Sequence, residues 1–167
     1  MTSTERQRYQ LPFRWPDPPF HIVLLEPEIP PNTGNIARLC AATASALHLI
    51  EPLGFRLTDS AMKRAGLDYW KDVQLRRHAD WQAFLDTVRP ARFFLFSTAG
   101  RRSCYETSFQ PGDCLVFGNE STGLPASLLS EWPDRVVGVP QRTDRVRSLN
   151  LANTVGIALY EALRQCQ

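Results

Sequence analysis

Short apolar segments recur along the chain and predict buried β-strands. Each segment has four to six residues and shows no regular alternation with polar positions. The segments cover residues 20–25, 47–50, 93–96, 114–117 and 136–139. Uninterrupted apolar runs of this length are typical of strands that are covered on both faces of a sheet.

Segments with helical spacing lie between the apolar runs. Apolar positions at i, i+3, i+4 and i+7 in residues 36–43 predict an amphipathic helix, with Asn32 or Thr33 as its N-cap. The same spacing recurs in residues 81–88, and a third helix is expected over residues 148–165. Because strands and helices alternate, the sequence predicts an α/β fold with a mostly parallel sheet and helices on both faces.

The chain of 167 residues is long enough to bury a core as one domain. Residues 1–19 are polar and then rich in proline, so we expect a flexible or loosely docked leader there. Residues 20–167 predict a single domain without internal repeats.

Composition excludes several classes of protein. The chain is 43% hydrophobic and 22% charged with a net charge of +2, unlike a disordered or collagen-like chain. No apolar run is long enough to span a membrane, and residues 1–10 lack the apolar segment of a secretory signal. The four cysteines are scattered and form no Cys-x-x-Cys pair. We therefore expect a cytoplasmic protein with free thiols and no metal site.

Ligands of open parallel sheets bind beyond the carboxyl ends of the strands, so the loops there are the first place to look for chemistry. The first loop, residues 26–35, leads into a helix on which Asn35 and Arg38 are one turn apart. We expect both side chains to face away from the core. A capped helix with a surface arginine explains the same pattern without any function.

The second loop, residues 117–125, carries Glu120 between Gly118 and Gly123. Glycines permit backbone conformations or close approach of a ligand that a side chain would block, and the acid has no obvious partner in the sequence. A turn followed by a helix cap is the alternative interpretation.

The third loop, residues 139–153, is basic and runs into the last helix, for which Ser148 is the expected N-cap. The free N–H groups at that helix end favour polar or anionic ligands. No Gly-x-Gly-x-x-Gly sequence follows the first strand and no Walker lysine loop is present, which disfavours an NAD or ATP enzyme.

Together the three loops resemble the motifs of the SPOUT methyltransferases, in the SpoU branch that methylates ribose 2′-hydroxyls of RNA. The matching segments are residues 32–35 with Arg38, residues 117–120 with 123–125, and residues 147–151 with Asn153. Three further segments resemble the small stand-alone tRNA (cytidine/uridine wobble) 2′-O-methyltransferases: residues 26–32, 50–55 and 64–69. The resemblance begins near residue 20. Ala152 departs from the serine frequent in this family, and residues 141–146 also depart from its pattern.

The resemblance implies a parallel α/β sheet whose C-terminal segment forms a deep trefoil knot. It implies a homodimer that binds tRNA, with the first motif helix close to the partner's cofactor pocket. It also implies S-adenosyl-L-methionine as cofactor and S-adenosyl-L-homocysteine as product, without a metal. The cofactor-binding positions carried over are Phe96, Ser97, Thr98, Gly118, Val139, Ser148 and Leu149.

The catalytic positions carried over by the resemblance are Arg38, Asn35, Glu120, Ser148, Asn150 and Tyr160. A guanidinium has a pKa above about 12 and no acceptor, so Arg38 is a poor general base. We expect Arg38 to position the target phosphate and to stabilise negative charge on the 2′-oxygen. Asn35 is expected to orient Arg38, and Glu120 to fix the second loop or to orient Arg38. Tyr160 either reaches the site or packs as a core tyrosine.

Because no separate RNA-binding domain is evident, the domain itself must hold the tRNA. Of the 19 basic residues only Lys63 and Lys71 are lysines, so 17 are arginines. The candidate phosphate contacts are Arg56, Lys63, Arg64, Arg76, Arg77, Arg89, Arg92, Arg101, Arg102, Arg142, Arg145 and Arg147. The expected activity is 2′-O-methylation of the wobble nucleotide of tRNA. Methylation of another tRNA or rRNA site, a non-catalytic RNA-binding module and a generic nucleotide-binding protein stay open as alternatives.

Overall fold

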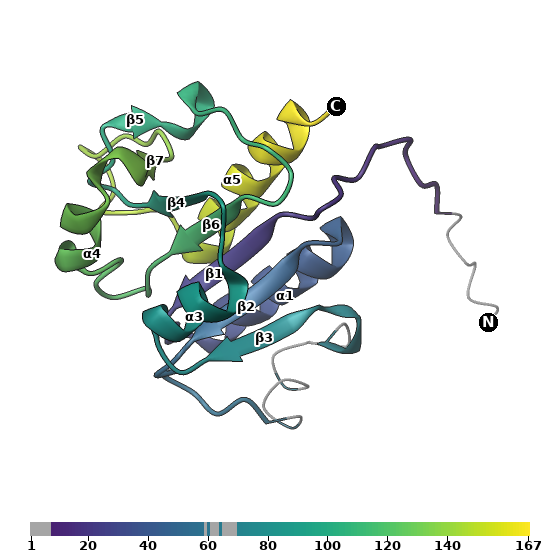
Figure 1. The fold of residues 1–167 in the computed structure, drawn as a ribbon, viewed down its shortest axis with the longest axis horizontal. Coiled ribbons are helices and arrows are strands. Elements are labelled where there is room, and N and C mark those ends of the chain that lie inside the picture. Colours follow the sequence, from purple (N-terminus) through teal and green to yellow (C-terminus); the bar gives the residue numbers. More distant parts are fainter. Residues whose placement is uncertain (1–7, 59, 61–63, 65–69) are drawn as a thin grey trace.

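The structure of the chain is a computed structural model that describes residues 8–58, 60, 64 and 70–167. Within that part, seven strands form one sheet in the order β3-β2-β1-β6-β4-β7-β5, and all paired strands are parallel (Figure 1). The strands are β1 (His21–Leu25), β2 (Ala46–Ile50), β3 (Leu75–His78), β4 (Phe93–Phe96), β5 (Arg102–Ser103), β6 (Cys114–Phe117) and β7 (Val136–Gly138). After β1 the chain continues to β2 on one side of the sheet, and after β6 it continues to β7 on the other side. The loops that follow β1 and β6 therefore leave in opposite directions from neighbouring strands, which is where open α/β sheets bind ligands.

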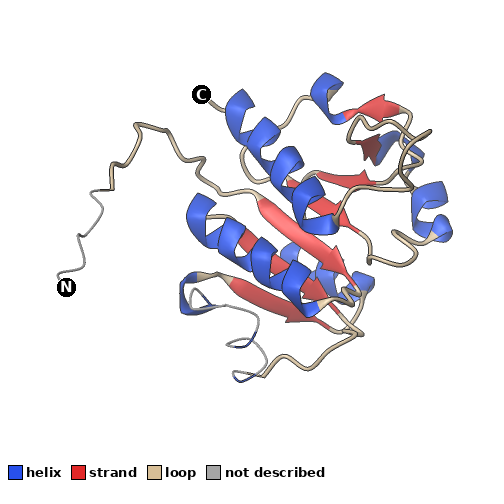
Figure 2. Cartoon of the chain, turned by 180° about the vertical axis from the view of Figure 1, so that it is seen from behind, coloured by secondary structure: helices blue, strands red, loops and turns tan. Residues whose placement is uncertain are grey.

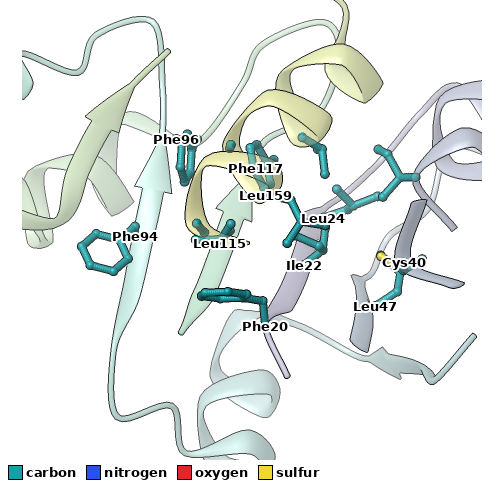
Figure 3. Close-up of a cluster of buried hydrophobic side chains, with 14 of the residues drawn as sticks. Phe20, Ile22, Leu24, Cys40, Leu47, Phe94, Phe96, Leu115, Phe117 and Leu159 are labelled. Carbon is teal, nitrogen blue, oxygen red and sulfur yellow. The ribbon is translucent and has the colours of Figure 1, made fainter. Parts of the chain in front are cut away.

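Helices α1 (Pro30–Thr43) and α5 (Leu151–Gln165) lie side by side on one face of the sheet (Figure 2). Their apolar stripes cover the strand residues that point to this face, including Ile22, Leu115 and Phe117 (Figure 3). Phe96 stacks on Phe117 with ring centroids 4.7 Å apart, which extends the core to β4. This layer fixes the start of α5 above the carboxyl ends of β4 and β6.

Helices α3 (Trp81–Val88) and α4 (Ala126–Glu131) cover the opposite face. Phe84 of α3 and Leu128 of α4 pack there against Val23 and Leu95, so the sheet has helices on both faces, as the sequence predicts. Three short 3-10 helices complete the described structure: η1 (Trp70–Asp72), η2 (Cys104–Glu106) and η3 (Pro133–Arg135).

Three histidines form a hydrogen-bonded row across adjacent strands under α3. His21 Nδ1 lies 2.9 Å from His48 Nε2, and His48 Nδ1 lies 2.9 Å from His78 Nε2. Phe84 packs edge-on against His48 and His78. Burial lowers the pKa of His48 to about 3 and also lowers the pKa of His21 and His78, and the Arg76 charge acts in the same direction on all three. The row is therefore uncharged near neutral pH.

The five predicted strands are present within one residue of their expected bounds, but the sequence pattern misses β3 and β5. Strand β3 contains Arg76 and Arg77, both exposed, because it is an edge strand with one partner. Strand β5 has only two residues and lies at the other edge.

Two predicted helix caps are wrong. Helix α1 begins at Pro30, with Ile29 as an N-cap that makes no side-chain bond, so Asn32 and Thr33 lie inside the helix. Proline suits the first helical turn because its missing N–H has no helical partner there. Helix α5 begins at Leu151, and its N-cap is Asn150 rather than Ser148.

The segment before β1 touches the C-terminus. Arg14 N donates to Gln167 Oε1 (3.3 Å), and Gln167 Nε2 donates to the Arg14 carbonyl oxygen (3.2 Å). Phe13 packs against the main core. The division into a leader (residues 1–19) and one domain (residues 20–167) stays a prediction, as does the trefoil knot. Residues 1–7, Lys63 and residues 65–69 lie outside the described residues.

Candidate functional site

A cavity of about 540 Å³ opens at the carboxyl ends of β4, β6 and β7, next to the start of α5. Its wall comes from the three loops that follow these strands, together with Ile29 and Asn32 from the segment after β1. The volume is in the range of small-molecule sites, and the position beyond parallel strand ends is where α/β sheets bind ligands.

Glu120 ties the loop after β6 to the segment that precedes α1. Its Oε2 accepts a hydrogen bond from Glu28 N (2.8 Å), and its Oε1 accepts one from Ile29 N (3.0 Å). Asn32 Nδ2 also donates to Oε1 (3.3 Å). A carboxylate suits this place because it offers two acceptor oxygens to N–H groups at the positive end of a helix.

Asn32 continues the chain of hydrogen bonds to the third loop. Its Oδ1 accepts from Asn150 Nδ2 (3.0 Å), and Asn150 Oδ1 accepts from Asn153 N (3.2 Å) to cap α5. The loops after β1, β6 and β7 are therefore joined around the cavity by Glu120, Asn32 and Asn150. In both Asn side chains, the amide nitrogen and the amide oxygen each make a hydrogen bond.

Gly118 lies where two segments of the second loop meet. A Cβ atom placed on Gly118 would lie 2.0 Å from the Gly123 carbonyl carbon and 2.2 Å from Leu124 N. Gly123 itself has a φ of +69°, a conformation that glycine adopts without strain. The turn from Asn119 to Gly123 is closed by a backbone hydrogen bond of 3.1 Å. The loop after β6 therefore requires glycine at these positions.

Gln141 and Arg147 shape the loop after β7. Gln141 Nε2 donates to the Arg147 carbonyl oxygen (3.3 Å), and Gln141 Oε1 accepts from Leu149 N (3.3 Å). The Arg147 guanidinium donates to the Ser121 carbonyl oxygen (2.8 Å), which joins this loop to the second loop at the cavity.

The structure brings most of the predicted site residues together at this cavity. The residues of that set that line it are Phe96, Ser97, Thr98, Gly118, Glu120, Val139, Ser148, Leu149 and Asn150. Asn35, Arg38 and Tyr160 are not among the lining residues, and all three side chains are exposed on α1 and α5. Tyr160 is 53% exposed, so it is not a core tyrosine in this chain.

The sequence predicts Asn32 as a helix cap and as part of the first motif, but it does not predict a role for Asn32 at the site. The motif is the signal that points to this residue, whereas its bonds to Glu120 and Asn150 depend on the fold. Gln141 was likewise counted only within a basic loop, since the hydrogen bonds of its side chain depend on the folded path of residues 141–149. Within the described part of the chain, no three His, Cys, Asp or Glu residues are placed to hold a metal ion. Among the described residues, no helix combines the length and the apolar character that a membrane span needs.

The fold and the site define an α/β protein with a cavity of small-molecule size at the carboxyl end of a parallel sheet. Comparison with protein families makes this specific: residues 19–160 match the SpoU rRNA Methylase family, and the chain belongs to that family. The resemblance found in the three loops is thereby confirmed.

Named relatives cover nearly all of the same region. A protein of Burkholderia cenocepacia called tRNA (cytidine(34)-2'-O)-methyltransferase is 54% identical in an alignment 149 residues long, which covers 87% of this chain and 95% of the relative. A solved structure described as "Structural insights into the 2-OH methylation of C/U34 on tRNA" is 51% identical, with a TM-score of 0.82 over 88% of this chain and 95% of that one. An AdoMet-bound rRNA methyltransferase from Sinorhizobium meliloti is 27% identical, with a TM-score of 0.77 over 89% of this chain and 57% of that one.

Proposed function

We propose that this protein transfers a methyl group from S-adenosyl-L-methionine to the ribose 2′-oxygen of the wobble nucleotide, cytidine or uridine, in tRNA. The observation that carries the proposal is the cavity closed by Glu120, Asn32 and Asn150 in a chain 54% identical to a tRNA (cytidine(34)-2'-O)-methyltransferase. A tRNA substrate also supports a cytoplasmic location.

The cavity suits S-adenosyl-L-methionine by its chemistry. Phe96, Phe117 and Leu124 offer apolar walls, while Ser97 and Ser148 add hydroxyl groups. The close backbone approach at Gly118 fixes the path of the second loop, and residues 118–124 of this loop line the cavity. The bound cofactor supplies an electrophilic methyl group on its sulfonium. The protein then has to align the 2′-oxygen with that methyl and accept or redirect its proton.

Arg38 has the chemistry to bind the phosphate of the target nucleotide and to stabilise charge that develops on the 2′-oxygen. It is not a proton acceptor, because a guanidinium carries only donors at physiological pH. Ser148 and Asn150 lie at the cavity and offer hydrogen bonds to the cofactor or the ribose. Asn35 lies one turn from Arg38 on the exposed side of α1, which supports a role in orienting that guanidinium.

A homodimer accounts for the position of Arg38. Arg38 does not line the cavity of its own chain, and it lies on the exposed side of α1. The neighbouring helix α5 exposes Ile157 (37%) and Tyr160 (53%), which offer apolar surface for a second copy. We propose that the α1 and α5 surfaces pair, so that Arg38 of one copy completes the cavity of the other.

The function is tested by incubating the protein with labelled S-adenosyl-L-methionine and total tRNA that lacks the modification, followed by mapping of the labelled nucleotide. The proposal expects label in 2′-O-methylcytidine or 2′-O-methyluridine at position 34. Label at another tRNA position, or transfer only to ribosomal RNA, would contradict the proposed target nucleotide but not the proposed methyltransferase activity. A chain that fails to bind the cofactor would contradict both.

A further inference from the structure

The loop after β7 carries an exposed arginine pair that is not part of the cavity wall. Arg142 Nη2 lies 3.4 Å from Asp144 Oδ2, and Arg145 Nε lies 3.3 Å from the same oxygen. The two arginine side chains are 73% and 71% exposed, and the Asp144 side chain is 61% exposed. Two guanidinium groups thus converge on a single carboxylate oxygen at the surface.

Hydrogen bonds of Gln141 close the segment that carries this pair. The Gln141 side chain donates to the Arg147 carbonyl oxygen and accepts from Leu149 N. Within the segment, Arg145 N donates to the Arg142 carbonyl oxygen (3.1 Å), which forms a turn. We call residues 142–146 the tip of this loop.

The tip lies at the rim of the candidate site. Gln141 and Arg147, which flank it in sequence, both line the cavity. Arg147 donates to the Ser121 carbonyl oxygen, so its guanidinium serves the contact between loops. Arg142 and Arg145 are left as the cations of the tip, and Val146 beside them is 48% exposed.

Convergence of two guanidinium groups on one anionic oxygen is the arrangement with which arginines bind phosphate. We propose that the tip is a binding site for a tRNA backbone phosphate, and that the Asp144 carboxylate occupies this site until an RNA phosphate replaces it. The inference rests on the proposed function, because it takes tRNA as the ligand. Replacement costs little, since ion pairs between exposed side chains contribute little free energy.

Asp144 has two consequences in this arrangement. It holds Arg142 and Arg145 together in the free protein, and it competes with the tRNA phosphate for both guanidinium groups. The competition outweighs the orientation, because ion pairs between exposed side chains hold them only weakly. Removal of its charge should therefore strengthen tRNA binding, whereas removal of either arginine should weaken it.

The test is equilibrium binding of unmodified tRNA over a series of KCl concentrations, with wild type and the variants Asp144→Asn, Arg142→Gln and Arg145→Gln. We expect Asp144→Asn to tighten tRNA binding about two- to fivefold, the size that competition by an exposed ion pair allows. Each Arg→Gln variant should weaken binding and reduce the slope of log K against log salt by about one. Cofactor affinity should stay unchanged in all three variants.

Two control variants separate a phosphate site from a general charge effect. Asp86→Asn changes the net charge by the same amount on the exposed side of α3, and it should leave tRNA affinity unchanged. Arg142→Lys keeps the charge without the planar fork and should give an intermediate affinity.

Unchanged or weaker tRNA binding by Asp144→Asn would overturn the inference, and so would an equal gain from Asp86→Asn. Failure of the proposed function has a different signature, because the wild-type chain would then transfer no methyl group to tRNA. If the wild type methylates tRNA and Asp144→Asn binds tRNA with unaltered affinity, the proposed function holds. The tip then does not bind a tRNA phosphate.

Discussion

At the scale of single residues, the site depends most on the hydrogen bonds of Glu120. One carboxylate accepts bonds from two backbone N–H groups and from Asn32, which in turn holds Asn150. A partly buried network of this kind is costly to disrupt, because each lost partner leaves a donor without an acceptor. Glu120 therefore acts on the shape of the site as a whole.

Glu120→Gln should lower the free energy of unfolding by about 1–3 kcal/mol, because the amide replaces one acceptor oxygen with a donor that faces a backbone N–H. The variant should also bind S-adenosyl-L-methionine more weakly. Urea unfolding and calorimetry measure the two effects. Glu131→Gln, at an exposed position of α4, is the matched control and should change neither. Equal stability of the two variants would mean that the loops hold together without Glu120.

Arg38→Ala should lose methyl transfer by about 10²- to 10³-fold in kcat, the size expected when a group that stabilises developing negative charge is removed. Because Arg38 is proposed to contact the phosphate and the 2′-oxygen of the target nucleotide rather than the cofactor, cofactor binding should be retained. Activity assays and calorimetry on the same preparation check both statements. Normal turnover by this variant would remove Arg38 from the mechanism.

At the scale of elements, the crossing at Gly118 fixes the loop after β6. The second loop turns back on itself so closely that a Cβ at Gly118 would meet backbone atoms of Gly123 and Leu124. Backbone atoms cannot move aside as the end of a flexible side chain can. One methyl group added at Gly118 is therefore expected to change the shape of this loop.

Gly118→Ala should lower the free energy of unfolding by at least about 1–3 kcal/mol, the usual cost of overpacking, and should weaken cofactor binding. Gly156→Ala is the contrasting control, because nothing lies within 4 Å of its added Cβ and alanine favours the interior of α5. It should raise stability by up to about 1 kcal/mol. Denaturation curves that rank the two variants in the opposite order would contradict this account of the loop.

Five of the strands follow directly from the apolar pattern of the sequence. Apolar runs predicted β1, β2, β4, β6 and β7 because buried parallel strands have few polar positions. The pattern missed β3 because Arg76 and Arg77 face solvent at an edge. The family resemblance of the loops predicts Glu120 and Asn150 as site residues, and both line the cavity. The same resemblance includes Asn32 in its first motif, but its bonding role is not predictable, because α1 begins at Pro30 and the bond between Asn32 and Asn150 spans 118 positions of sequence.

At the scale of the whole molecule, the row of His21, His48 and His78 couples stability to pH. The folded pKa of His48 is about 3, against 6.5 in an unfolded chain. Below pH 6.5 the unfolded chain therefore takes up protons that the folded chain does not. The stabilising contribution is complete above pH 6.5 and is lost as the pH falls toward 3.

For His48 alone, the free energy of unfolding should fall by about 2 kcal/mol between pH 6.5 and pH 5, since each pH unit is worth about 1.4 kcal/mol for one fully shifted group. Urea unfolding at several pH values measures this slope. His48→Gln keeps a polar side chain that does not titrate, and its stability should depend less on pH in this range. Parallel curves for the two proteins would show that His48 does not carry the effect.

The proposed reaction of the whole molecule transfers the methyl group to one ribose oxygen of the anticodon. The most direct test compares methyl transfer to an unmodified tRNA with transfer to the same tRNA carrying a 2′-deoxynucleotide at position 34 alone. The account predicts one methyl group per intact tRNA and none for the deoxy-substituted molecule, with equal binding of both. Undiminished methylation of the deoxy-substituted tRNA would contradict it, because the acceptor oxygen would then lie elsewhere.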